Sequence, residues 1–148
     1  MVILKDSIEI RAKPDKIFHW LKNLDKNYKE WHPDHVKCVN LMDSEELQIE
    51  DVFLYEEYLH GELHKLKFKL TKIEENTRIE FKSLFPISLI CPGGSFIIEP
   101  KGENSIFIAT LSFRLGKLFS KFAKSKVDAI KQHMKEEGEN LKKLLEKD

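Results

Sequence analysis

The chain has 148 residues, 41% of them hydrophobic, and its 25 lysines and arginines balance its 25 aspartates and glutamates. This length and apolar content predict one globular domain spanning residues 1–148. The neutral total charge gives no electrostatic reason to expect a nucleic acid or a membrane as a partner. No apolar run approaches the roughly 20 residues of a membrane span, and no leader-like segment opens the chain. We therefore expect a cytoplasmic protein, either a monomer or a homodimer.

The first third of the chain has the pattern of a strand, two short helical pieces and a second strand. Residues 2–11 alternate as a strand, Pro14 starts a short amphipathic helix, and a helical or irregular piece covers about 25–34. The second piece ends in the bend Tyr-Lys-Glu-Trp-His-Pro-Asp-His at 28–35, which presents its side chains because proline forces an extended backbone before it. Residues 36–42 then form the next strand.

The clearest hairpin lies at 51–73, where apolar side chains alternate with polar ones. If His60 and Gly61 form a two-residue turn, Glu57 and His64 lie directly opposite each other on the inner face. The apolar side chains that share this face are Phe53, Tyr55, Leu59, Leu66, Phe68 and Leu70. A shift of one residue would turn Glu57 outward, so its inward position depends on this turn.

The rest of the chain supplies a strand at 77–83, a hairpin of strands at 95–100 and 105–114, and a long helix at 117–148. The segment 84–94 is apolar and interrupted by proline and glycine. We expect it to form a wall or a lid of a pocket.

The long last helix has one apolar stripe that a charged residue interrupts. Its apolar members are Phe119, Ala123, Val127, Ile130, Met134, Leu141 and Leu145. Glu137 falls inside this stripe and His133 lies one turn earlier at its shoulder, so the two side chains project toward one point. A carboxylate on a buried face is costly unless another group pairs with it.

This order of elements predicts an α+β protein in which a curved antiparallel sheet surrounds the last helix. The arrangement resembles the helix-grip fold of the START/Bet v 1-like (SRPBCC) superfamily, which holds a cavity between helix and sheet. Here the inner faces of the helix and of the hairpin both carry polar groups. An ordinary apolar core does not account for them.

Two imidazoles and two carboxylates are candidates to meet beneath the helix. They are His133 and Glu137 from the helix, Glu57 from the hairpin, and either His35 or His32 from the bend. Such a set can coordinate Zn²⁺ or another divalent metal, which would also neutralise the buried carboxylates. The alternative is a histidine and a glutamate that are merely exposed or salt-bridged. Cys38 and Cys91 form no CxxC pair, so we expect buried thiols in a reducing compartment.

Other polar residues of the predicted pocket have more than one possible role. His64, opposite Glu57, is a hydrogen-bond partner, an acid or base of the pocket, or an extra metal ligand. Tyr28 and Tyr55 carry hydroxyls that need partners if buried, so they are candidates for contacting a ligand. Trp31 and Phe68 are better explained as core.

Three segments resemble the diacetylphloroglucinol/phloretin hydrolase family: residues 28–35, Glu-Tyr-Leu-His-Gly-Glu-Leu-His-Lys-Leu at 57–66, and His-Met-Lys-Glu-Glu at 133–137. Members of that family are zinc-dependent enzymes of the same superfamily that hydrolyse a carbon–carbon bond between an acyl group and a phenolic ring. The resemblance implies a zinc site made of His35, Glu57, His133 and Glu137, and it implies that Tyr28 contacts the substrate.

The function expected from these features is zinc-dependent hydrolysis of a small acylated phenol or related ketone, with one zinc ion per chain. The metal would polarise an oxygen of the substrate and activate water, while Tyr28 or His64 protonates the departing ring carbon. Two alternatives stay open because one scaffold hosts many functions. They are a non-catalytic carrier of a hydrophobic small molecule and a metal-free enzyme of the polyketide cyclase type.

Overall fold

The computed structural model describes residues 1–114 and 121–146, so Phe119 of the predicted stripe lies outside the described residues, as does the side chain of Ala123. One antiparallel sheet of seven strands forms in the order β1-β7-β6-β5-β4-β3-β2. The strands are β1 (Val2–Ile10), β2 (His35–Asn40), β3 (Val52–Leu59), β4 (Glu62–Glu74), β5 (Arg78–Ser83), β6 (Gly93–Lys101) and β7 (Asn104–Phe113). The predicted α+β helix-grip fold is confirmed.

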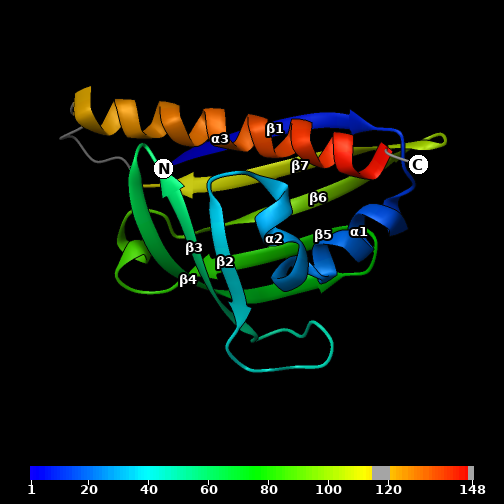
Figure 1. The fold of residues 1–148 in the computed structure, drawn as a ribbon, viewed down its shortest axis with the longest axis horizontal. Coiled ribbons are helices and arrows are strands. Elements are labelled where there is room, and N and C mark those ends of the chain that lie inside the picture. The colour runs from blue at the N-terminus through cyan, green and yellow to red at the C-terminus, as the bar shows by residue number, and fades with distance from the viewer. Residues whose placement is uncertain (115–120, 147–148) are drawn as a thin grey trace.

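Three α-helices accompany the sheet. The long helix α3 (Lys121–Glu146) runs beside β1 and β7, while α1 (Pro14–Lys22) and α2 (Leu24–Trp31) follow β1 (Figure 1). Helix α2 lies between β2 and α3, so the bend that follows α2 is placed beside the long helix. Within the two described ranges, no helix is long and apolar enough to cross a membrane.

The apolar stripe of α3 is buried against the sheet as predicted. Val127, Met134, Leu141 and Leu145 are all buried. Gly138 brings the helix close to β1, since a Cβ there would lie 3.0 Å from Asp6 Oδ2 and 3.4 Å from Ile8 Cγ2. The residues of α3 that precede and follow Gly138 are therefore held tightly over the sheet.

The register predicted for the β3–β4 hairpin is confirmed. His60 and Gly61 form the turn with φ of 55° and 79°, the left-handed conformations that a tight two-residue hairpin requires. Glu57 pairs with His64 across the two strands. On the other side of β3, Glu57 pairs with His35, and an irregularity between His35 and Lys37 shifts the register of β2 there.

A row of phenylalanines crosses the inner face of the sheet, one from each of five adjacent strands. The rings are Phe53, Phe68, Phe81, Phe96 and Phe107, with neighbouring centroids 4.9–5.8 Å apart. Gly94 leaves room for this row, because a Cβ there would lie 2.9 Å from Phe81 Cζ and 2.2 Å from Thr110 O. The row forms a continuous apolar band across the sheet.

Candidate metal centre

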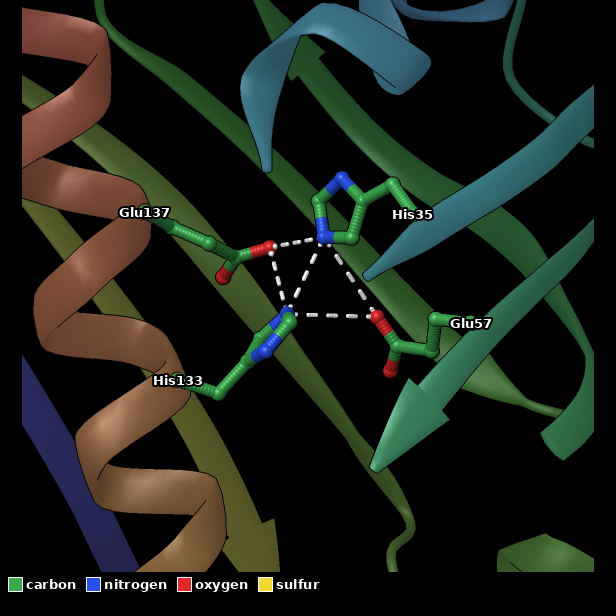
Figure 2. A group of neighbouring side chains, drawn as sticks. All are labelled: His35, Glu57, His133 and Glu137. Carbon is green, nitrogen blue, oxygen red and sulfur yellow. Dashed lines mark hydrogen bonds and ion pairs between the residues drawn. The ribbon is translucent and has the colours of Figure 1, made fainter. Parts of the chain in front are cut away.

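Four side chains from three distant parts of the chain converge beneath α3. Figure 2 shows His35 from the start of β2, Glu57 from β3, and His133 and Glu137 from α3 pointing at one another. One nitrogen or oxygen atom from each residue lies within 4.8 Å of all the others. Three of these residues also line a cavity of about 370 Å³. The four residues are called the His/Glu cluster below.

Five of the six distances between the cluster atoms are close to those of a tetrahedral coordination sphere. His35 Nε2 lies 2.9 Å from Glu137 Oε2, 3.0 Å from His133 Nε2 and 3.5 Å from Glu57 Oε2. His133 Nε2 lies 3.3 Å from each carboxylate oxygen. Zinc bonds of about 2.0–2.2 Å in a tetrahedron place neighbouring ligand atoms about 3.3 Å apart. The donor set therefore fits a divalent ion of this kind at the centre of the cluster.

A hydrogen bond to the backbone fixes the orientation of His35. Its Nδ1–H donates to the carbonyl oxygen of Tyr28 at 2.8 Å, because a carbonyl oxygen can only accept. The Tyr28 ring stacks on the imidazole, with centroids 3.8 Å apart and planes 6° from parallel. These contacts leave the lone pair of the neutral His35 Nε2 facing the cluster, which is how metal-binding histidines are usually held.

The contact between His35 and Glu137 requires a positive charge between or beside the two groups. Nε2 of a neutral His35 and Oε2 of an ionised Glu137 both present lone pairs, and they lie only 2.9 Å apart. Lone pairs at this distance repel unless the positive charge of a nearby proton or cation offsets the repulsion. The chemistry of the donor set thus requires either protonated imidazole or a metal ion.

Burial and neighbouring charges shift the pKa values of His133 and Glu137 in the cluster. Burial acts to lower the pKa of His133, but its hydrogen bonds to Glu137 and Glu57 and their charges outweigh burial, so the pKa of His133 is raised. Burial acts to raise the pKa of Glu137, but the hydrogen bonds and charges of His133 and His35 outweigh it, so the pKa of Glu137 is lowered. Without a metal, the cluster therefore holds a proton on His133 at neutral pH.

The two histidines of the bend lie in two neighbouring groups that could hold a metal, His35 with Glu57, His133 and Glu137, and His32 with His133 and Glu136. His32 Nδ1 accepts the backbone N–H of Asp34, so its proton is on Nε2, which donates to Glu136 Oε1 at 2.9 Å. The His32 ring lies 4.2 Å from the ring of His133, beside the His/Glu cluster. His35 contributes the atom that faces Glu57 and Glu137.

Tyr28 touches the cluster directly as well as lining the cavity. Its hydroxyl donates to Glu57 Oε2 at 2.8 Å, the same oxygen that faces the two imidazoles. Burial, followed by the charges of Glu57 and Glu137, raises the pKa of Tyr28 far above its ordinary value. Tyr28 is therefore a neutral phenol that orients Glu57 and faces the space where a ligand fits.

Two residues that the sequence reasoning did not assign to the site tie α2 to α3. Trp31 Nε1 donates to the carbonyl oxygen of Glu137 at 2.9 Å, and Asn140 Nδ2 donates to the carbonyl oxygen of Trp31 at 3.0 Å. These bonds hold the bend and the helix at a fixed separation. Trp31 is fully buried, as expected for a core residue, and its polar edge sets the position of Glu137.

His64 and Tyr55 lie in the cavity wall with different environments. His64 lines the cavity opposite Glu57, and its Nε2 is 4.0 Å from Glu62 Oε2. The Tyr55 hydroxyl has no hydrogen-bond partner among the described residues. Burial and the charge of Glu57 raise the pKa of Tyr55 well above its ordinary value. Tyr55 thus offers a neutral O–H to a ligand. Most other lining side chains are apolar.

Other predicted features have clear outcomes. Cys38 and Cys91 are both free and buried, as expected. The segment 84–94 includes a short 3-10 helix, η1 (Ile87–Leu89), and contributes Ile87, Ile90 and Cys91 to the wall of the cavity. His60 is exposed at the turn, as expected.

Comparison with known proteins places the chain in a family. A family model described as polyketide cyclase/dehydrase and lipid transport matches residues 1–146. The chain belongs to this family. Its fold is that of the START/Bet v 1-like superfamily, whose members include ligand-binding and cyclase-type proteins. No curated protein sequence matches the chain.

Solved structures of similar fold cover almost the whole chain. The ZhuI aromatase/cyclase from Streptomyces sp. R1128 superposes with a TM-score of 0.80 at 14% identity, over 98% of this chain and 93% of that chain. The protein TTHA0849 from Thermus thermophilus gives 0.78 at 16% identity, covering 97% of both chains. Norcoclaurine synthase from Thalictrum flavum, in complex with dopamine and hydroxybenzaldehyde, gives 0.76 at 13% identity over 99% and 88%. Identities this low show the fold alone.

Proposed function

We propose that this protein is a zinc-dependent hydrolase that cleaves the carbon–carbon bond between an acyl group and the ring of a small phenolic or related ketone. The observation that carries the proposal is the His/Glu cluster, whose four ligand atoms have tetrahedral spacing at the wall of a largely apolar cavity of about 370 Å³. The motif resemblance to the diacetylphloroglucinol/phloretin hydrolase family supports the same four ligands. The family match supports a small hydrophobic ligand.

The reaction adds water across the aryl–acyl bond. The hydroxyl of water joins the acyl carbon to give a carboxylic acid, and a proton joins the ring carbon to give the free phenol. A bound zinc ion would polarise an oxygen of the substrate and lower the pKa of water. The protein itself must bind the ring, orient the acyl group toward the cluster and deliver the proton.

Two residues are proposed as the source of the proton for the ring carbon. Tyr28 stays protonated at neutral pH because burial and nearby carboxylates raise its pKa, and its hydroxyl already lies at the cluster. His64 lines the same cavity from the neighbouring strand β4. Tyr55, with its unpaired hydroxyl, is proposed to hold a further oxygen of the substrate.

Metal content and product analysis test this proposal together. We expect about one zinc per chain in untagged protein, measured by plasma mass spectrometry, and its loss in Glu137→Ala. The zinc-loaded protein should convert monoacylated and diacylated polyphenols to the corresponding carboxylic acid and deacylated phenol, detected by mass spectrometry. Absence of stoichiometric zinc after zinc is offered near neutral pH would end the hydrolase proposal.

The cavity and the family description also favour a second function, non-catalytic binding of a hydrophobic small molecule. This function needs no metal, and the cluster would then hold a proton on His133 between its carboxylates. The two proposals differ in the fate of the ligand. A carrier releases an acylated phenol or another apolar ligand unchanged, with zinc present or absent. A metal-free cyclase-type enzyme would instead convert a ligand after complete removal of metal by a chelator.

A further inference from the structure

One end of the cavity is bordered by exposed apolar side chains. Phe85, Leu89 and Ile90 are 78%, 60% and 54% exposed. Leu89 is the last residue of η1, and the other two lie just before and just after it in the segment between β5 and β6. We call these three residues the apolar ridge. Ile87 and Cys91 of the same segment line the cavity. The segment therefore has one face toward the cavity and another toward solvent, where adjacent large apolar side chains indicate an interaction site.

The stretch of chain that contains the ridge and the stretch that contains Arg114 carry charge of one sign, although the whole chain is neutral. Residues 81–98 and 105–127 contain no aspartate or glutamate. The basic residues in these two stretches are Lys82, Arg114, Lys117, Lys121, Lys124 and Lys126. Because the total charge is zero, the acidic residues that balance them lie elsewhere in the chain. The total conceals a segregated basic region.

Backbone hydrogen bonds place two of these basic residues beside the ridge. The backbone N–H of Arg114 donates to the carbonyl oxygen of Ile90 at 2.8 Å. Lys82 precedes Ser83, whose backbone N–H donates to Pro92 at the other end of the segment at 2.9 Å. Lys82 and Arg114 are exposed, and neither has an ion-pair partner within residues 1–114 and 121–146. Their charges are available to an external anion.

The ridge also adjoins residues that line the cavity. Ile87 and Ile90 line the cavity together with Lys126 and Val127 of α3. A hydrophobic ligand that enters between this segment and the long helix passes the exposed apolar side chains. The same surface would therefore serve a ligand that is dissolved in a lipid phase.

We propose that the apolar ridge and its basic flank dock on an anionic phospholipid surface, from which the hydrophobic ligand enters the cavity. Apolar side chains that insert at the headgroup boundary and lysines or arginines that face lipid phosphates act together in such binding. A second copy of the chain fits this surface less well, because it would bring two basic regions together. This proposal replaces the expectation, drawn from total charge, that no membrane takes part. It does not depend on the metal or on hydrolysis.

Vesicle sedimentation of the full-length protein tests the proposal. We expect binding to phosphatidylcholine vesicles that contain phosphatidylserine, weak binding to phosphatidylcholine alone, and weaker binding as salt is raised. Phe85→Ser combined with Leu89→Ser should lower the affinity tenfold or more, since each loses a buried apolar side chain at the interface. Lys82→Gln or Arg114→Gln should each lower it about fivefold.

A matched control removes equally exposed apolar side chains elsewhere. Met42 and Ile49, 59% and 53% exposed, lie in the connection between β2 and β3, and Met42→Ser with Ile49→Ser should leave vesicle binding unchanged. Circular dichroism and melting temperature establish that each variant is folded. Three results would overturn the proposal: no vesicle binding, equal binding to neutral vesicles, or equal loss in the control pair. So would a stable dimer that only the Phe85/Leu89 variant dissociates, because the ridge would then be a self-association surface.

Discussion

The buried Asp51 and the half-buried carboxylates of the His/Glu cluster are stabilised in different ways. Asp51 is buried and accepts hydrogen bonds from Asn40 Nδ2 at 3.1 Å, Ser44 Oγ at 2.7 Å and the backbone N–H of Gln48 at 2.9 Å. All its partners lie within eleven residues along the chain. The carboxylates of the His/Glu cluster are instead paired with imidazoles from distant elements and border a cavity.

The difference separates a carboxylate that organises a loop from carboxylates of a candidate site. Each oxygen of Asp51 accepts a hydrogen bond from a neutral donor of the same connection, so this residue orders the chain between β2 and β3. Glu57 and Glu137 present their oxygens to the nitrogens of two histidines at the spacing of metal ligands. Burial of a charge alone therefore does not identify a functional site, whereas the type and origin of its partners do.

The largest expected contrast comes from replacing each carboxylate with its amide. Glu137→Gln should lower zinc affinity by at least about 100-fold, beyond the 10–100-fold typical of losing an outer hydrogen-bond partner, because it removes a charged ligand. The melting temperature of the metal-free protein should change little. Zinc affinity is measured by competition with a chromogenic chelator. Retention of wild-type zinc affinity by Glu137→Gln would remove this residue from the metal site.

Asp51→Asn should lower stability and leave zinc affinity unchanged, the reverse of Glu137→Gln. The new amide N–H₂ would face groups that donate hydrogen bonds to the carboxylate in the wild type, and it cannot accept them. The free energy of unfolding should therefore fall by about 2 kcal/mol. For a chain of this length, that corresponds to a melting temperature lower by roughly 4–8 °C. Zinc affinity should stay unchanged. Thermal unfolding followed by circular dichroism, in parallel with the chelator assay, measures both, and a loss of zinc binding here would break the distinction between the two groups.

Zinc binding should depend on pH through the cluster. In the metal-free protein the pKa of His133 is raised by Glu137 and Glu57, so His133 carries a proton at neutral pH. Zinc needs the neutral imidazole, so binding releases this proton, and the apparent zinc affinity should rise about tenfold per pH unit below the raised pKa. Calorimetric titrations in buffers with different ionisation enthalpies count the released protons. Asp51→Asn serves as the control and should release the same number; zinc binding without proton release contradicts a protonated cluster.

A smaller effect is expected where Tyr28 supports Glu57. Tyr28→Phe should slow hydrolysis about tenfold, because the Tyr28 hydroxyl orients the carboxylate of Glu57 and faces the substrate. About one zinc per chain should remain bound. Tyr58→Phe is the matched control, since Tyr58 follows Glu57 on β3 but is exposed to solvent. The measurements are kcat, KM and metal content. Loss of zinc from Tyr28→Phe would mean that Tyr28 holds the metal site together rather than contacting substrate.

Much of the site followed from local periodicity. The alternation of a strand and the turn residues His60 and Gly61 predict that Glu57 faces inward, because side chains change face at every residue. The helical period places His133 and Glu137 on one face of α3 for a similar reason. The order of the elements also predicted an antiparallel sheet with the long helix last. The motif resemblance selected His35, and the contacts of His35 agree.

Other features depended on contacts that no local pattern carries. The spacing of Asp51 from Asn40 and Ser44 resembles any polar loop, and its burial arises only when the connection folds on itself. The bond from Trp31 to the backbone of Glu137 joins residues 106 positions apart. Neither contact could be inferred from composition or spacing. Polar residues are common in all loops, and every residue has a backbone carbonyl that can accept a hydrogen bond.

By itself, the sequence determined which residues face the interior of each element, since the periods of strand and helix are properties of the local backbone. It therefore determined that two carboxylates and at least one imidazole are carried inward. Only the tertiary structure showed which groups the two histidines of the bend face, because this depends on the hydrogen bond of His35 to Tyr28 and that of His32 to Glu136. Only the tertiary structure placed Arg114 beside the apolar ridge, because a backbone hydrogen bond to Ile90 joins two segments that are distant in the sequence.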